Sequence, residues 1–137
     1  MSREILFRGK HIHAMDSNEH LNGTWVHGYL SDKDYIYDKS LEGEFLVDED
    51  TICQYTGLTD KNGKKIFEGD IVRYGEVCGE VKFGLHESNW QIGKYNQGFF
   101  VTFPKEYLLR NELGYWRNKI VVVGNVFDNP ELLEEVE

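Results

Sequence analysis

Four histidines near the N-terminus are the first candidates for metal chemistry. His11 and His13 form an H-x-H pair. On a strand both side chains would point to one side, as two ligands of a metal ion must. His20 or His27 would supply a third ligand. These residues lack the spacing of known zinc sites, so a polar strand end or a surface loop is the favoured interpretation, and we predict no metal.

The two cysteines, Cys53 and Cys78, could supply a nucleophile but are too few for a disulfide framework. A reactive thiol needs a helix N-terminus or a cationic neighbour that lowers its pKa. Cys53 instead lies between Ile52 and Gln54 in a predicted strand. We expect both cysteines to be small buried hydrophobic residues.

Clustered carboxylates could serve acid–base catalysis. That chemistry requires one carboxyl group in an apolar pocket, so that the two pKa values separate. The acids concerned are expected in turns or at the C-terminus, where water solvates them. They are Glu42, Glu44, Asp48, Glu49, Asp50, Glu134, Glu135 and Glu137. We therefore predict no catalytic residues and no cofactor, with a hydrolase or metal enzyme as an alternative.

The segment QYTGLTDKNGKKIFEGDIV, residues 54–72, combines turn signals with acidic and amide side chains. Asp60, Asn62 and Glu68 suggest a calcium loop. However, Lys65 occupies the position of the required Gly, and Ile71 occupies that of the bidentate Glu. The segment is better explained as architecture.

Two reversals define that architecture. Asn62-Gly63 predicts a tight hairpin turn with positive φ. Glu68-Gly69-Asp70 predicts a second reversal, with a left-handed or bulged glycine and an aspartate that accepts backbone N–H groups. The residues assigned to this structural motif are Gly57, Asp60, Asn62, Gly63, Glu68, Gly69 and Asp70.

Short apolar runs separated by Gly, Asn and Asp predict many short strands that position these residues. The predicted strands are 5–8, 24–30, 34–37, 44–47, 51–55, 65–72, 79–83, 89–93, 98–103 and 120–127. The β-branched residues of 120–127 indicate burial on both faces. Two short helices are predicted, at 104–114 with Gly114 past its end and at 129–134 with Asn129 as N-cap.

These elements predict a mainly β fold, with a small SH3-like barrel around residues 54–83 or barrel-like sheets. The 137 residues suit a single domain, 1–137, or two lobes of roughly 1–50 and 51–137. The aromatic residues are expected to pack in the core, and an exposed subset would mark a subunit interface. They are Trp25, Tyr29, Tyr35, Tyr37, Trp90, Tyr95, Phe99, Phe100 and Trp116.

The formal net charge of −9 argues against nucleic-acid binding, because a phosphate-binding surface needs clustered Lys and Arg. No run approaches the roughly 20 apolar residues of a membrane span, and the N-terminus lacks an apolar signal segment. We therefore expect a soluble cytoplasmic protein.

The segment 54–72 resembles the signature of the YopX family, small proteins encoded by bacteriophages and prophages. Residues 5–10, 25–30 and 123–133 resemble the opening, second and closing blocks of the same family. The resemblance implies a mainly β, oligomeric protein of phage origin, found in the cytoplasm of the bacterial host. It implies no catalytic residues.

We therefore expect a non-enzymatic phage or prophage accessory protein that acts through protein–protein contact, with a host or phage partner or as a homo-oligomer. One alternative is an acidic nucleic-acid mimic that blocks a host or phage DNA-binding protein. Another is a small nucleic-acid-binding SH3-like module.

Overall fold

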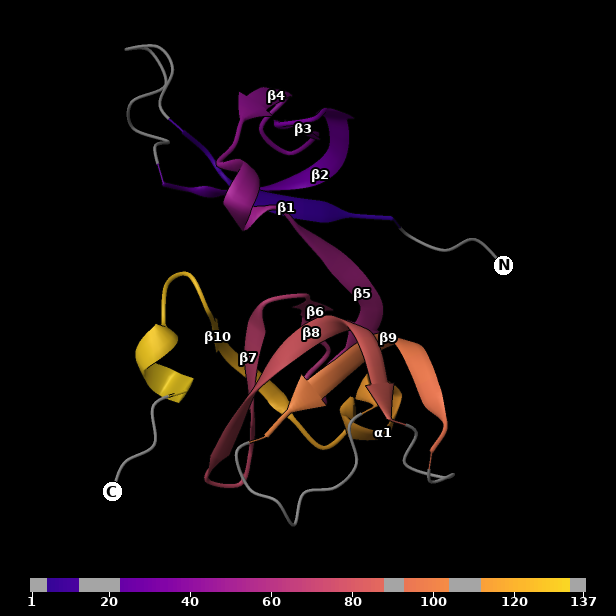
Figure 1. Ribbon diagram of the computed structural model, residues 1–137. Helices are drawn as coiled ribbons and strands as arrows, with labels where there is room; N and C mark the ends of the chain where they lie inside the picture. Colours follow the sequence, from indigo (N-terminus) through magenta and orange to yellow (C-terminus); the bar gives the residue numbers. More distant parts are fainter. Residues whose placement is uncertain (1–4, 13–22, 88–92, 104–111, 134–137) are drawn as a thin grey trace. The chain divides into compact units, whose positions relative to one another are not determined.

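The computed structural model describes residues 5–12, 23–87, 93–103 and 112–133 (Figure 1). These residues form short antiparallel strands and a few helical turns, which confirms the mainly β class. The strands are β1 Phe7–Lys10, β2 Trp25–Asp32, β3 Tyr35–Asp38, β4 Gly43–Leu46, β5 Cys53–Thr59, β6 Lys65–Phe67, β7 Asp70–Tyr74, β8 Val77–Glu87, β9 Tyr95–Thr102 and β10 Val121–Asn125. The helical turns are η2 Glu49–Thr51, α1 Leu113–Trp116 and η3 Pro130–Leu133.

The chain divides into two compact units, Met1–Tyr55 and Thr56–Glu137. Each has its own hydrophobic cluster of buried residues. The strand β5 contains the boundary between them, because its first residues belong to the first unit and its last to the second.

In the first unit the strands follow the order β4-β3-β2-β1-β5. Strict alternation places Val26 of β2 and Ile36 of β3 on the core face. Phe45 and Val47 complete the buried cluster, with Phe7 and Ile52 packed against it. The residues next to Val26 and Ile36 in sequence must therefore lie on the opposite face of the sheet.

In the second unit the strands β10-β7-β8-β9 form a four-stranded antiparallel sheet, and β6 neighbours β5. Its core consists of Ile66, Val72, Val81, Val101, Leu113, Trp116 and Ile120, all buried. The Glu68-Gly69-Asp70 reversal ends β6 and begins β7 in a different sheet. As a result, the described strands of residues 54–83 are divided between two open sheets, and their order does not close into the predicted SH3-like barrel.

Two predictions about the C-terminal third need correction. The run 120–127 was expected to be buried on both faces, but β10 is half-buried throughout because it is the edge strand of its sheet. Gly114 was expected to follow a helix, but it lies inside α1, which begins at Leu113 because Leu113 and Trp116, one turn apart, enter the core.

Two predicted elements lie largely outside the described residues. They are the first predicted helix, of which residues 104–111 are not described, and the predicted strand 89–93, of which residues 89–92 are not described. The short C-terminal helix is confirmed as the single turn η3. In the part of the chain that the structure describes, no helix is long and apolar enough to cross a membrane.

Candidate functional site

The Asn62-Gly63 reversal joins β5 to β6 in a tight turn. Gly63 has a φ of 83°, which a residue with a Cβ rarely adopts. The Gly63 N–H donates to the Asp60 carbonyl at 3.0 Å, and the Asp60 N–H donates to the Lys64 carbonyl at 2.8 Å. The backbone at 60–64 is thus closed by its own hydrogen bonds.

The buried carboxylate of Asp60 organises this turn from within. Its Oδ1 accepts the N–H groups of Asn62 and Lys64, both at 2.9 Å. Its Oδ2 accepts the Val122 N–H, also at 2.9 Å. Burial by itself raises the pKa of Asp60, but these three hydrogen bonds and the charge of Lys64 outweigh it, so the pKa lies below its ordinary value. Asp60 therefore ties the hairpin to β10.

The Glu68-Gly69-Asp70 reversal is connected to two further strands. Gly69 has a φ of 85°; its N–H donates to the Val81 carbonyl, and its own carbonyl accepts the Val126 N–H, each at 2.9 Å. The Asp70 carboxylate is buried and accepts the Phe67 N–H at 2.8 Å. The reversal thus joins the end of β6 to β8 and to the residue after β10.

The other two motif residues lie beside these turns. Gly57 is exposed in β5 with a φ of 86°, and Glu68 is half-buried. All of the motif residues belong to the second unit, and the hydrogen bonds described above for Asp60, Gly69 and Asp70 are made with the backbone of that unit. The chemical role of these residues in the structure is to accept and donate hydrogen bonds that fix the backbone of the two reversals.

A third buried aspartate, Asp38, was missed by the sequence reasoning. Its Oδ1 accepts the N–H and hydroxyl of Ser40, at 2.9 and 2.6 Å, and the Leu41 N–H at 3.3 Å; its Oδ2 accepts the His27 N–H at 2.9 Å. Burial raises the pKa of Asp38, and these hydrogen bonds lower it further than burial raises it. The signal was an Asp with Ser two positions later between two strands, typical of an Asx turn.

The candidate metal ligands are distributed differently from the prediction. His11 is buried rather than exposed, with its Nδ1 2.7 Å from the Leu46 carbonyl and its ring edge-on to Phe45. His27 is exposed, and His13 and His20 lie outside the described residues. Among the residues that the structure describes, no three His, Cys, Asp or Glu side chains gather where they could hold a metal ion.

The cysteines lie in different units. Cys53 is buried, as predicted, whereas Cys78 is half-buried. Cys78 borders a shallow depression of about 220 Å³ with Glu80, Thr102, Phe103 and Leu133. This volume is below the roughly 300 Å³ at which small-molecule sites begin, so the depression is a weak candidate.

Of the acids of the first unit that were considered for acid–base catalysis, one accepts a hydrogen bond from the backbone. Asp48 is half-buried and its carboxylate caps η2 by accepting the Asp50 N–H at 3.1 Å. Glu42, Glu49 and Asp50 are exposed. Glu44 is exposed on β4 rather than in a turn. Residues 134–137 lie outside the described chain.

The prediction that the aromatic residues pack in the core is confirmed for Trp116 and wrong for several others. Phe99 packs against the same core, and Trp90 is not among the described residues. Tyr29, Tyr35 and Tyr95 are exposed. Sheet alternation explains this difference, since in β2 and β3 the tyrosines occupy the positions opposite the core.

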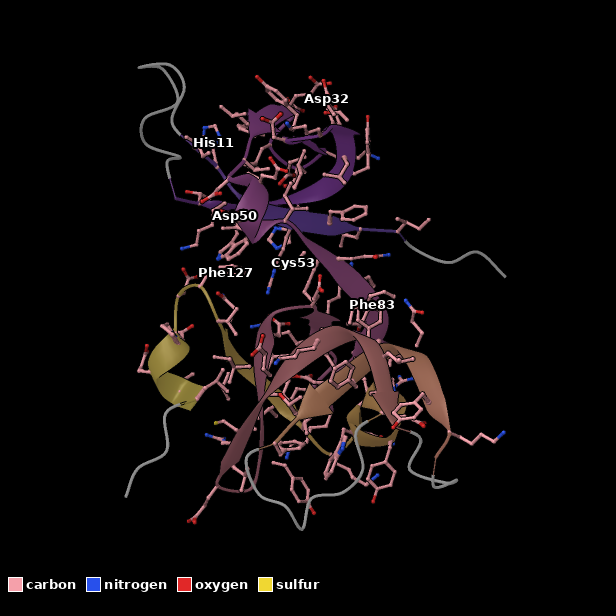
Figure 2. The ribbon with its side chains drawn as sticks, viewed as in Figure 1. His11, Asp32, Asp50, Cys53, Phe83 and Phe127 are labelled. Carbon is pink, nitrogen blue, oxygen red and sulfur yellow. The ribbon has the colours of Figure 1, made fainter. Side chains whose placement is uncertain are left out.

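The tyrosines of β2 and β3 form part of a regular array on the first unit, which we call the tyrosine face. It consists of two rows across β2, β3 and β4, and the paired residues of each row share one side of the sheet. The rows are Tyr29–Tyr37–Glu44 and Asp32–Tyr35–Leu46. The rings of Tyr29 and Tyr37 stack with centroids 5.3 Å apart. Asp32, the last residue of β2, is labelled in Figure 2.

The second unit has an exposed apolar surface on β8 and β9, which we call the ribbon face. Phe83, Leu85 and Tyr95 are 50%, 68% and 59% exposed. Their register places them on one side of the two strands together with Phe99, whose ring is 4.9 Å from that of Phe83. Phe83 is labelled in Figure 2.

A comparison with family models decides the relationship of the chain to known proteins. The model described as YopX protein matches residues 7–134. The chain belongs to the YopX family. A search of curated proteins found no significant match.

The YopX match includes the motif 54–72 and both units, and it confirms the resemblance seen in the sequence. The structure adds a physical reason for one residue in the block Trp25–Leu30 of this YopX protein. A Cβ at Gly28 would overlap the carbonyl oxygen of Tyr37 on β3. Glycine at this position therefore allows β2 and β3 to approach closely.

Proposed function

We propose that this YopX-family protein is a phage or prophage accessory protein that acts without catalysis, through protein contact, and that it first associates with a second copy of itself. The observation that supports this proposal is the ribbon face. Work in the host cytoplasm is part of the proposal.

The ribbon face lies where the sheet narrows to two strands. β7 pairs with β8 only from Val77 to Glu80, whereas β8 and β9 pair from Glu80 to Glu87 and from Tyr95 to Thr102. A two-stranded ribbon is marginal in water unless one of its faces is covered. On one side of this ribbon His86 is buried and stacks on Phe100, while Phe83, Leu85 and Tyr95 on the other side are exposed. The open side is therefore the side that gains most from a partner.

A second copy fits this surface because one of its two strands, β9, carries no charged residue. The segment Tyr95–Thr102 contains no Lys, Arg, Asp or Glu. Two chains that each carry a formal net charge of −9 repel one another, and they do so least where their apolar and uncharged parts meet. Edge strands of monomeric proteins commonly carry a charge or a proline that prevents pairing with a strand of another chain. The sequence of β9 contains neither.

Sedimentation velocity of the full chain tests this proposal. We expect a concentration-dependent dimer or larger assembly, and we expect Leu85→Lys to raise its dissociation constant about tenfold or more, about 1.4 kcal/mol. Leu41→Lys is the matched control, because Leu41 is also exposed but lies in the β3–β4 turn. A wild-type protein that stays monomeric at about 100 µM, where even weak specific dimers form, contradicts the proposal.

A further inference from the structure

We propose that the tyrosine face binds an arginine-containing segment of a partner protein in extended conformation. This inference rests on the proposed function of protein contact, but it concerns a different surface and a different partner from the ribbon face. It specifies which side chains of a partner protein the first unit would bind.

The two rows place carboxylates beside aromatic rings in a fixed pattern. Glu44 lies directly across from Tyr37. Asp32 pairs with Tyr35 just after a register shift in β2, and its Oδ1 accepts the Lys33 N–H at 2.7 Å, which leaves Oδ2 for a ligand. Directly opposed residues in a sheet have Cβ atoms about 5 Å apart. Both acids are exposed, as are Tyr29 at 57% and Tyr35 at 37%. Each row therefore offers one negative charge next to one or two ring faces.

Arginine is the side chain that uses both features together. Its planar guanidinium stacks on an aromatic ring while its N–H groups bind a carboxylate in a bidentate geometry. A lysine ammonium meets a ring as a point charge and lacks the planar fork. Acidic side chains are repelled by Asp32 and Glu44, and neutral side chains gain no charge attraction from them.

The spacing of the rows favours an extended partner. Tyr35 and Tyr37 are two residues apart on β3, which separates the rows by about 7 Å. In an extended peptide, alternate side chains on one face repeat at the same distance. Arginines at every second position would therefore meet successive rows.

The charge of the first unit complements such a segment. Residues 1–55 contain eleven acidic and five basic residues, a formal net charge of −6, whereas residues 56–137 contain thirteen and ten, a net charge of −3. A basic segment is thus attracted most strongly to the unit that carries the tyrosine face.

The β3–β4 turn holds the array in place. Asp38 accepts hydrogen bonds from Ser40 and Leu41 within the turn and from the His27 N–H on β2. This buried carboxylate therefore ties the end of β3 to β2 and to the turn that leads into β4. Stacking and pairing groups held by rigid elements lose little freedom when a ligand binds.

The test uses a fluorescein-labelled peptide, (Gly-Arg)4, titrated with the full-length protein at low salt and followed by fluorescence anisotropy. We expect saturable binding, about threefold or more tighter than that of (Gly-Lys)4. Equal affinity for the two peptides would mean attraction by charge alone and would overturn the proposal, as would no binding.

Matched variants locate the site. Glu44→Gln and Tyr29→Leu should each weaken (Gly-Arg)4 binding about three- to tenfold, and Tyr29→Phe should retain most of it. Glu49→Gln removes the same charge from an exposed position in η2 and should leave the affinity unchanged. Equal losses for Glu44→Gln and Glu49→Gln would refute the assignment, with thermal melting confirming that each variant folds.

Two further measurements separate this inference from its alternatives. The first uses a labelled oligothymidylate of eight nucleotides. If it binds and its binding depends on Tyr29, the tyrosine face is a site for single-stranded nucleic acid, and the proposal is overturned. Leu85→Lys should bind the peptide normally, and Glu44→Gln should sediment as the wild type. Failure of self-association and failure of peptide binding are thereby told apart.

Discussion

At the scale of single residues, Gly69 is a position where the second unit depends on the backbone freedom of glycine. Its φ of 85° costs an L-residue about 1–2 kcal/mol, and both its N–H and its carbonyl are bonded to other strands, so it cannot relax freely. We expect Gly69→Ala to lower the free energy of unfolding by at least this amount, measured by denaturant titration.

Gly114 provides the control for that measurement. It lies in α1 and a Cβ there would meet open space, so Gly114→Ala should stabilise the protein by about 0.5–1 kcal/mol. If Gly69→Ala proved as stable as the wild type, the reversal at 68–70 would serve something other than the fold.

The pH dependence of stability should show the Asp60 network. Because the folded pKa of Asp60 lies below the unfolded one, its contribution is complete above the unfolded pKa, close to 3.8, and is lost as the pH falls through the folded pKa. At neutral pH we expect Asp60→Asn to cost about 1.5–3 kcal/mol, since it weakens hydrogen bonds to a charged group.

Unfolding titrations between neutral and acidic pH check this expectation. The difference in unfolding free energy between wild type and Asp60→Asn should stay constant down to about pH 5 and then shrink. Glu76→Gln, at an exposed acid in the β7–β8 turn, removes the same charge and should leave the unfolding free energy at neutral pH unchanged. A gap that persists unchanged into strong acid would show that the charge of Asp60 does not matter.

Local chemistry made part of this motif predictable. The positive φ of Gly63 and Gly69 and the backbone hydrogen bond accepted by Asp70 follow from the residues beside them. The bond between Asp60 and the Val122 N–H spans 62 positions, and no local pattern indicates it. The burial of Asp38 was equally hidden, because its hydrogen bond to His27 depends on how β2 and β3 pair.

At the scale of elements, the sequence located strands better than it assigned them to sheets. Short apolar runs mark strands such as β2, β3 and β8 directly, because one alternating face must be apolar. Whether a strand is central or at an edge depends on distant partners. For this reason the β-branched run at 120–127 was expected to be covered on both sides although β10 is an edge strand.

The same limit explains the aromatic residues. Tyr35 and Tyr37 alternate with Ile36, so the sequence implies that they share a face, but not which face meets the core. That choice is made by Val26 and Phe45 on the neighbouring strands and by the close approach that Gly28 allows between β2 and β3. The tyrosine face is therefore a property of three strands together.

At the scale of the whole molecule, the two proposed contacts differ in the charge of their surfaces. The ribbon face lies over a strand without charged residues, whereas Asp32 and Glu44 are part of the tyrosine face. A chain with a formal net charge of −9 opposes its own association through the charges outside the contact, but attracts a basic segment through the same charges. Added salt screens both effects.

The two contacts should therefore respond to salt in opposite directions. Between about 0.02 M and about 0.3 M sodium chloride the screening length falls from roughly 20 Å to below 10 Å. We expect self-association, measured by sedimentation, to strengthen over this range, because apolar burial at Leu85 remains while repulsion fades. The affinity for (Gly-Arg)4 should fall over the same range. Self-association that weakens with salt would mean that opposite charges, rather than the ribbon face, hold the copies together.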